Sequence, residues 1–321
     1  MSIHIEEFSP GETEAWDRFV DKSNNGTIFH KLRFLDYHPE NRFNFNHLIF
    51  HKDGKILALL PGGMENRTFK SPRGASFGGF VLKDTSFSKT DKIVKRFLEY
   101  CIHKDIERVS LIPAPIIYSK VFNMNLDYAL LSNGFKYSKH FFTSAIDLHN
   151  KDIESLQIYK GGARNAIRKA DKSNIRVEIK DDYDSFYPIL SKNKEKFKTP
   201  PTHSLTELKK LTHLIPENLK LFLAYRKGKL IAGSLIFICN SKTLLAFYIA
   251  LDYNYQKFRP INYLLHEIVK WGRTNAFNYL DLGVNQEPNP DNPMELNPGL
   301  VSFKESMGAK CFFRSEFCRK V

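Results

Sequence analysis

The chain contains one pattern of alternating apolar and polar residues twice, each time around a glycine turn. Residues 47–66 hold two β-rich runs on either side of Asp53-Gly54, and residues 221–240 hold two on either side of Lys227-Gly228. Such runs around a two-residue turn predict a β-hairpin in each stretch. The sequence GK(I/L)(L/I)A begins at both Gly54 and Gly228, which lie 174 positions apart. The two hairpins are therefore predicted to be copies of one unit.

Each predicted hairpin is followed by an amphipathic helix and then by a short strand. Apolar residues at i, i+4 spacing from Ile93 to Cys101 precede the strand 108–112, and those from Leu264 to Trp271 precede the strand 279–283. This spacing places the apolar side chains on one helical face. Further amphipathic helices are expected upstream of the hairpins, at residues 12–21 and 183–194. The alternation predicts the α/β class, with mixed sheets and helices on their faces.

The repeat also predicts the domain organisation. A chain of 321 residues is about twice as long as an ordinary domain. We therefore expect two related domains in tandem, residues 1–147 and residues 148–321. The boundary follows a predicted strand, 140–147, and a helical stretch from Ile153 to Lys172 opens the second domain. The last strand, at about residues 309–321, could pack on the N-terminal domain.

The composition is that of a folded protein. Hydrophobic residues make up 42% and charged residues 26% of the chain, which argues against disorder. The N-terminus has acids where a signal peptide needs basic residues, and no run approaches about 18 apolar residues. We therefore expect a cytoplasmic monomer without a transmembrane segment, and peripheral attachment to the inner face of the membrane stays open.

Several familiar kinds of site are missing from the sequence. The four cysteines are scattered without a CxxC pair, so neither a zinc site nor a disulfide framework is expected, and no metal is assigned. The sequence also lacks GxSxG, HExxH, GxxxxGK(S/T) and GxGxxG motifs. Serine hydrolases with a nucleophile elbow, zinc peptidases and phosphate-loop enzymes are therefore not indicated.

The basic residues suggest an anionic partner. The formal net charge is +13, which concentrates nucleotides, sugar phosphates, RNA or acidic membranes near the surface. Lys160, Arg164, Arg168 and Lys172 follow one another at i+4 steps and line one stripe of a predicted helix. Such a stripe could hold a diphosphate or an RNA backbone. Alternatively, it is a solvated helix face.

A strand–loop–helix segment provides a second candidate anion site. Residues 252–262 join the predicted strand 244–251 to the helix that carries Trp271. Free N–H groups and the dipole at the start of a helix attract anions. Gln256 and Arg259 are therefore candidate ligands, although the segment could also be a structural turn.

The loop after the strand 279–283 leads to a candidate catalytic lysine. Asp281 lies near the end of that strand, and the following segment is rich in proline and asparagine, as loops that border sites often are. Asn297 is expected to cap the next helix, residues 300–307, and Gly308 to end it. This helix presents Lys304, which could stabilise negative charge that develops on a reacting carbonyl. It could equally be an exposed surface lysine.

Five stretches together resemble the FemAB-like proteins, which have two acetyltransferase-fold (GNAT) domains in tandem. That family includes peptidoglycan aminoacyltransferases and CelD-like acyltransferases. The stretches are GTIFHKLRFLDYH (26–38), ARNAIRKADKSNIRVE (163–178), FYIALDYNYQKFRPINYLLHEIVKWG (247–272), YLDLG (279–283) and NPGLVSFKESMGA (297–309). The resemblance covers most of the chain. It implies two GNAT-like domains, a substrate cleft, no metal, and transfer of an acyl or aminoacyl group to an amine.

The resemblance also implies roles for individual residues. Lys304 in FKESMG is similar to the lysine that peptidoglycan aminoacyltransferases place near the ester of aminoacyl-tRNA. Together with Lys304, Asp281 is the second candidate catalytic residue. Arg164 and Arg168 resemble the basic helix that holds a UDP-linked precursor. His38 stands where relatives can have a lysine that contacts the same diphosphate. The rest of the expected substrate-binding set is Phe303, Tyr248, Gln256 and Arg259.

One departure from the family concerns coenzyme A. Acetyl-CoA-dependent relatives have a (Q/R)xxGx(G/A) loop whose glycines let the backbone approach the pyrophosphate. This chain has Arg259 and Ile261 in place of the two small residues. Side-chain contacts from an arginine could take over that role.

We therefore expect an amide-forming acyltransferase that moves an aminoacyl or acyl group to an amine of a cell-envelope acceptor, a peptidoglycan precursor or a polysaccharide. Aminoacyl-tRNA or acyl-CoA would be the donor substrate, and no tightly bound cofactor is expected. The acceptor would be an anionic UDP-linked or lipid-linked precursor. Two alternatives stay open: an acetyl-CoA-dependent N-acyltransferase acting on an amino sugar, and a non-catalytic module that binds RNA or another polyanion.

Overall fold

The computed structural model describes residues 2–150, 153, 155–196, 198–287 and 292–321. The chain divides into two compact units, of which unit 1 comprises Met1–Phe141 and Phe313–Val321, and unit 2 comprises Phe142–Phe312. Each unit has a hydrophobic core of its own. Strands β8 (Lys136–Asp147) and β14 (Lys310–Lys320) each begin in one unit and end in the other.

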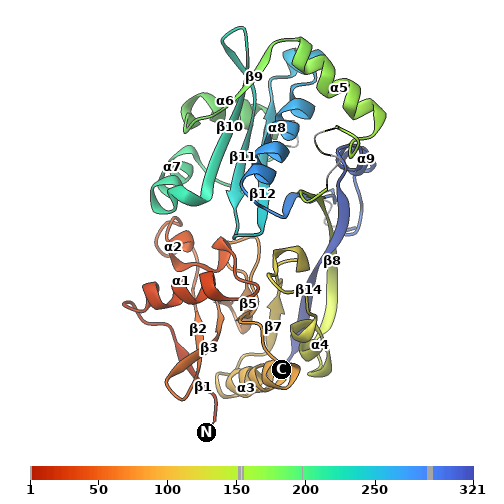
Figure 1. The fold of residues 1–321 in the computed structure, drawn as a ribbon. Helices are drawn as coiled ribbons and strands as arrows, with labels where there is room; N and C mark the ends of the chain where they lie inside the picture. Colours follow the sequence, from red (N-terminus) through yellow and green to blue (C-terminus); the bar gives the residue numbers. More distant parts are fainter. Residues whose placement is uncertain (1, 151–152, 154, 197, 288–291) are drawn as a thin grey trace. The chain divides into compact units, whose positions relative to one another are not determined.

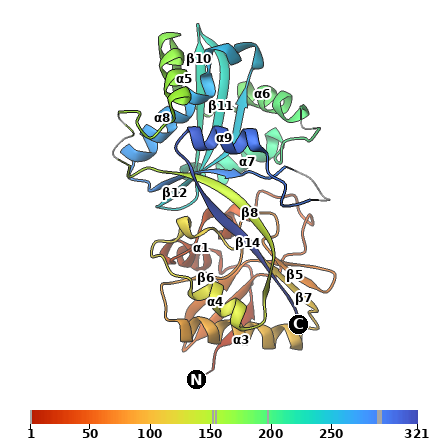
Figure 2. The ribbon, with the colours of Figure 1, turned by 90° about the vertical axis from the view of Figure 1, so that its right-hand side faces the viewer.

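Unit 1 contains two groups of paired strands, in the orders β1-β2-β3-β6 and β4-β5-β7-β14. The short strands are β1 (His4–Glu7), β2 (Leu48–Lys52), β3 (Lys55–Leu60), β4 (Gly63–Glu65), β5 (Thr68–Ser71), β6 (Val81–Leu82) and β7 (Arg108–Leu111). The helices are α1 (Thr13–Lys22), α2 (Leu32–Leu35), α3 (Phe87–His103) and α4 (Asn125–Ser132), with 3-10 turns at Ile28–His30 and Ile116–Tyr118. Figure 2 shows α3 and α4 close together in this unit.

The core of unit 1 lies between α3 and the strands. The apolar face predicted from Ile93 to Cys101 is buried along α3. Phe97 on this face contacts Phe69 of β5 and Phe80 before β6, with ring centroids 5.4 Å apart in both pairs. The helical spacing of apolar residues thus gives the packing that the sequence predicts.

Unit 2 contains one antiparallel meander that is extended by a parallel strand. Its strands are β9 (Ile175–Ile179), β10 (Leu219–Arg226), β11 (Lys229–Ile238), β12 (Thr243–Leu251) and β13 (Tyr279–Val284), and they pair in the order β13-β12-β11-β10-β9. Its helices are α5 (Gly161–Lys172), α6 (Tyr183–Glu195), α7 (Leu205–Leu214), α8 (Pro260–Thr274) and α9 (Pro298–Ser306), with 3-10 turns at Pro216–Asn218 and Tyr253–Phe258. Figure 1 shows α5 and α8 on one face of this sheet and α6 and α7 on the other. The α/β class with mixed sheets is confirmed.

Both hairpins predicted from the repeated sequence are present. β2 pairs with β3 across Asp53-Gly54, and β10 pairs with β11 across Lys227-Gly228. Both residues of each turn have positive φ, 52° and 70° in the first turn and 51° and 75° in the second. This is the type I′ geometry, whose twist matches that of the flanking strands. The same local sequence therefore forms the same local structure in both units.

The helix predicted from Ile153 to Lys172 begins later than expected. α5 starts at Gly161 with Lys160 as its N-cap residue, and residues 155–158 form turns. Leu156 has φ of 61°, which a right-handed helix does not accommodate. Ile153 and Tyr159 are both buried in the core of unit 2. Their burial folds this segment against the core, so the helical pattern holds only from residue 161 onward.

Candidate active site

In unit 2, strands β12 and β13 lie side by side where they begin and separate towards their ends. Their parallel pairing stops at Leu245 and Asp281, although β12 continues to Leu251 and β13 to Val284. In the part of the chain that the structure describes, the later half of β12 has no strand partner on this side. An unpaired strand edge presents N–H and C=O groups. The separation therefore provides a place where an extended ligand could lie along β12.

Helix α9 carries Lys304 to the end of β13. Both predicted caps are confirmed, although α9 spans Pro298–Ser306 rather than residues 300–307. Asn297 Oδ1 accepts a hydrogen bond from the N–H of Leu300 at 2.8 Å, and Gly308 follows the helix with φ of 80°. Lys304 donates from Nζ to the backbone carbonyl oxygens of Gly283 and Val284, at 2.8 Å each. These two bonds fix the ammonium group against the last residues of β13.

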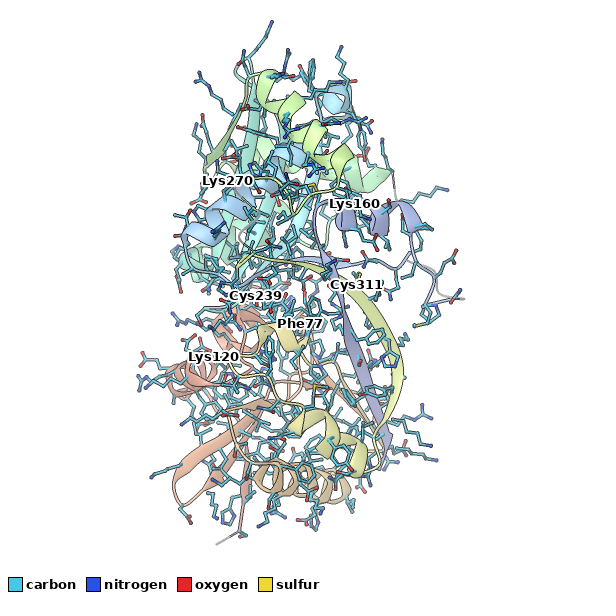
Figure 3. The ribbon with its side chains drawn as sticks, turned by 45° about the vertical axis from the view of Figure 1, so that its right-hand side comes forward. Phe77, Lys120, Lys160, Cys239, Lys270 and Cys311 are labelled. Atoms are coloured by element: carbon cyan, nitrogen blue, oxygen red, sulfur yellow. The ribbon has the colours of Figure 1, made fainter. Side chains whose placement is uncertain are left out.

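The Lys304 ammonium is buried. Its side chain lies in the core with 4% exposure, so the alternative of an exposed surface lysine is wrong. Burial lowers the pKa of Lys304 to about 8, while the neighbouring Asp281 and Cys311 oppose this shift. Lys304 therefore still carries its charge at neutral pH but loses it under mildly alkaline conditions. Cys311, labelled in Figure 3, lies at the start of β14.

Asp281 organises the turn that holds the lysine. It is buried, and its Oδ1 accepts hydrogen bonds from Thr143 Oγ1 at 2.8 Å and from the N–H of Gly283 at 2.7 Å. Gly283 has φ of 77°, a conformation that glycine adopts at little cost. The carboxylate thus stabilises the bend after which the two carbonyls face Lys304.

Asn285 continues the same network, and the sequence alone did not single it out. It is completely buried, and its Nδ2 donates to the backbone oxygen of Phe142 and to Ser144 Oγ, at 2.8 Å each. Its own backbone oxygen accepts the N–H of Asn297 at 2.9 Å. Asn285 therefore connects the end of β13 to β8 and to the N-cap of α9. The sequence signal that could have identified Asn285 was its position two residues after Asp281-Leu282-Gly283.

Gly308 should be required for placing α9. Its φ of 80° disfavours other residues, and a Cβ added there would lie 2.8 Å from the backbone oxygen of Ile158. We expect Gly308→Ala to lower the free energy of unfolding by about 1–3 kcal/mol and to reduce transfer, because the helix that carries Lys304 must shift. Chemical denaturation and an activity assay measure the two effects. Gly162→Ala in α5, where an added Cβ meets nothing within 4 Å, is the matched control. It should leave the free energy of unfolding and the transfer activity unchanged.

The predicted Gln256 lies in the 3-10 turn Tyr253–Phe258, and Arg259 follows this turn at the start of α8. Arg259 is the N-cap residue in the left-handed conformation, with φ of 58°, and no side-chain cap covers the N–H groups that follow Pro260. Arg226 lies 3.9 Å from the ring centroid of Phe258, so another cation borders the same loop. Sequence reasoning missed Arg226, because it comes from the preceding hairpin.

The basic stripe is divided between a helix end and the surface of α5. Lys160 forms an ion pair with Glu305 of α9 at 3.0 Å, and it is the N-cap rather than part of the helix. Figure 3 labels it beside α9. Arg164 bonds to Gln157, and Arg168 is exposed. The two arginines therefore project from the helix that packs against α8 and α9.

Tyr248 and Phe303 serve the packing of unit 2. The Tyr248 hydroxyl accepts the N–H of His203 and hydrogen-bonds to its Nδ1, at 3.0 Å each. Burial raises the pKa of Tyr248 to about 12. Phe303, next to Lys304, packs against the core cluster. The predicted substrate contacts of both side chains stay predictions.

His38 belongs to unit 1. Its Nε2 bonds to the backbone oxygen of Gly74 at 2.7 Å, and its ring contacts Tyr37 and Phe43. α2 ends at Leu35, so His38 lies beyond the helix rather than at its last turn. Its predicted contact with a diphosphate stays a prediction.

Comparison with known proteins identifies the fold. Residues 159–289 match the family model described as "Acetyltransferase (GNAT) domain", and no curated protein sequence matches the chain. FemX has a similar structure, with a TM-score of 0.73, 14% identity, and coverage of 98% of this chain and 97% of FemX. L-PGS from Bacillus licheniformis has a TM-score of 0.64 and 13% identity, with coverage of 98% of this chain and 93% of L-PGS. The tandem GNAT protein from the clavulanic acid biosynthesis pathway has a TM-score of 0.57 and 7% identity, with coverage of 99% of this chain and 98% of that protein.

The matched segment and the site overlap. The GNAT match extends from the residue before Lys160 to the loop after β13, and so contains Asp281 and Asn285, whereas Lys304 lies beyond it. The structural likenesses extend over almost the whole length of each compared chain and so include both units. The predicted tandem fold and the predicted enzyme class are confirmed. Residues 159–289 therefore form an acetyltransferase (GNAT) domain, and the chain has a tandem GNAT fold like those of FemX and the tandem GNAT protein.

Proposed function

We propose that this acyltransferase forms amide bonds by moving an aminoacyl or acyl group to an amine of a cell-envelope acceptor, a peptidoglycan precursor or a polysaccharide. The observation that carries the proposal is the buried ammonium of Lys304, held by two carbonyls at the end of β13. A fixed cation in a site shielded from water stabilises developing negative charge far more strongly than one in water.

The reaction that fits this geometry is acyl transfer through a tetrahedral intermediate. The acceptor nitrogen attacks the carbonyl carbon of an ester or thioester, a C–N bond forms, and the carbonyl oxygen becomes negatively charged. The C–O or C–S bond then breaks, and the leaving alcohol or thiol takes the proton that the amine loses. Two N–H groups of Lys304 bond to Gly283 and Val284, so the third can point towards the charged oxygen. Asp281 acts here as a positioning residue.

For the donor, we propose aminoacyl-tRNA, with acyl-CoA as the second candidate. Resemblance to the FemAB-like proteins and the FKESMG sequence support the first. The GNAT match at residues 159–289 and the uncapped start of α8 beside Arg259 support the second, which would make the protein an N-acyltransferase acting on an amino sugar.

Thermal-shift titration distinguishes the two donors. A ligand at a hundredfold excess over its Kd should stabilise the native protein by about 2.7 kcal/mol, which raises the Tm by about 5–10 °C for a unit of this size. We expect this shift with a non-hydrolysable aminoacyl-tRNA analogue and no shift with acetyl-CoA. If acetyl-CoA produces a shift instead, Arg259→Ala should reduce that shift, whereas Lys270→Ala, near the other end of α8, should not. RNA binding without product from either donor would favour a non-catalytic module instead.

The acceptor is proposed to be a UDP-linked or lipid-linked anionic precursor. Arg164 and Arg168 on α5 are the proposed ligands of its diphosphate, because guanidinium groups match phosphate oxygens. We further propose that the protein is a monomer and works in the cytoplasm, where such precursors and aminoacyl-tRNA occur together. Among the described residues, no helix is long and apolar enough to cross a membrane.

A further inference from the structure

Exposed apolar side chains gather at one place on unit 1. Six of the thirteen exposed large hydrophobic side chains in the described part of the chain lie there, with exposed fractions of 36–64%. They form the apolar patch: Phe87, Val121, Phe122, Met124, Tyr128 and Leu131. The rings of Phe87 and Tyr128 are 5.6 Å apart, which joins the start of α3 to α4. Single exposed apolar residues are common, but a cluster indicates an interaction surface.

A basic groove of about 1000 Å³ also lies on unit 1. Its basic border is formed by five exposed lysines, and its lining includes the aliphatic side chains of Ile56 and Ile93. We call it the lysine groove, after Lys52, Lys55, Lys83, Lys89 and Lys92. None of these five lysines makes an ion pair with a described residue, in contrast to Lys95, which pairs with Asp91. The lining also contains Arg96 and three acidic residues, Asp53, Asp84 and Glu99, so basic side chains outnumber acidic ones by seven to three.

The lysine groove and the apolar patch are parts of one surface. Asp84 and Thr85 line the groove, and both bond to the loop that carries the patch. Asn123 Nδ2 donates to Asp84 Oδ1 at 3.0 Å, and Asn125 Nδ2 donates to the backbone oxygen of Thr85 at 2.9 Å. Lys120, the residue before Val121, is labelled in Figure 3, and its Nζ donates a hydrogen bond to the backbone oxygen of Asp21. These contacts fix the apolar side chains next to the lysines.

The combination favours a lipid surface over a nucleic acid. None of the described residues that line the groove is aromatic, so stacking with bases has no platform there. A phosphate backbone would satisfy the lysines but would leave the patch at Val121, Phe122 and Met124 in contact with water. An anionic bilayer matches both features, because its phosphates attract basic residues while its interface accepts apolar side chains.

We propose that unit 1 docks on the surface of a bilayer that contains anionic phospholipids. The apolar patch enters the interface, and the lysine groove binds the headgroup phosphates. This proposal concerns where the protein acts, and it is independent of the acyl-transfer reaction proposed for unit 2.

Flotation of the full chain with vesicles tests the docking. We expect binding to vesicles of phosphatidylcholine with 30% phosphatidylglycerol, weakening as salt rises, and little binding to pure phosphatidylcholine. Val121→Ser combined with Phe122→Ser should weaken binding on the order of tenfold to a hundredfold. Lys89→Gln combined with Lys92→Gln should weaken it on the order of tenfold or more. Each variant should keep its thermal unfolding midpoint and its transfer to a water-soluble acceptor.

Matched variants outside the surface separate docking from general effects. Ile102→Ser removes an apolar side chain of 65% exposure from the far end of α3, and it should leave binding unchanged. Lys192→Gln combined with Lys210→Gln removes the same charge from unit 2 and should also have no effect. The proposal is overturned if the wild type does not bind the anionic vesicles, or if these controls weaken binding as much as the test variants. Binding of tRNA at Lys89 and Lys92 without vesicle binding would also overturn it.

Discussion

Replacing Lys304 with methionine should lower the rate of acyl transfer by about two to three orders of magnitude while unit 2 stays folded. Methionine fills a similar apolar volume, but it has no N–H to donate to a negatively charged oxygen. Removal of one such donor from an acyl-transfer site costs about a factor of 10²–10³ in kcat. The measurement is kcat with the donor and acceptor that the binding experiments identify, together with circular dichroism to confirm the fold.

The neighbouring Lys310 supplies the control for this experiment. It lies at the start of β14 and is exposed, so Lys310→Met should leave the rate unchanged. A Lys304→Met variant with nearly normal turnover would rule out charge stabilisation by this lysine. If both variants lost activity equally, the loss would reflect a general effect of removing positive charge.

Asp281→Asn should destabilise unit 2 by about 1–2 kcal/mol and shift the alkaline limit of transfer to lower pH. Hydrogen bonds from Thr143 and Gly283 now end on a charged oxygen, and a neutral amide oxygen accepts more weakly. The negative charge of Asp281 also raises the pKa of Lys304, which burial lowers to about 8. Since the ammonium form is the active one, the wild-type rate should fall above about pH 8. Without Asp281 it should fall at lower pH.

A pH profile of kcat between about 6 and 9.5, with one acceptor throughout, measures this shift. Glu305→Gln is the control, because Glu305 follows Lys304 on α9 and pairs on the surface with Lys160. Glu305→Gln removes one negative charge, as Asp281→Asn does, but leaves the buried hydrogen bonds of Asp281 and Lys304 in place. The pH above which the transfer rate falls should therefore not change. An Asp281→Asn profile that overlays the wild type would contradict the coupling between the two side chains.

The two units use their shared fold differently. In unit 2, the separation of β12 and β13, the start of α8 and the Lys304 network lie around the end of one sheet. Unit 1 repeats the hairpin but has the apolar patch and the lysine groove on its surface. We therefore propose that transfer takes place in unit 2, while unit 1 provides support and attachment to the membrane.

The sequence by itself determined the features that depend on neighbouring residues. The turns at Asp53-Gly54 and Lys227-Gly228 need positive φ, which glycine and its partner supply wherever this sequence occurs. The apolar spacing along α3 and α8 marked their buried faces. Asn297 and Gly308 bounded α9 correctly, because capping is a contact between residues a few positions apart. The repeat and its fold class followed from these local signals.

Only the tertiary structure decided the features that depend on residues far apart in the chain. Lys304 is buried because the carbonyls of Gly283 and Val284 replace water around its ammonium, and no local pattern separates such a lysine from an exposed one. Thr143 reaches Asp281 across 138 positions, so its role could not be read from spacing. α5 begins at Gly161 because burial of the preceding segment outweighs its helical pattern. Long-range burial, rather than local propensity, thus made the catalytic lysine proposed here.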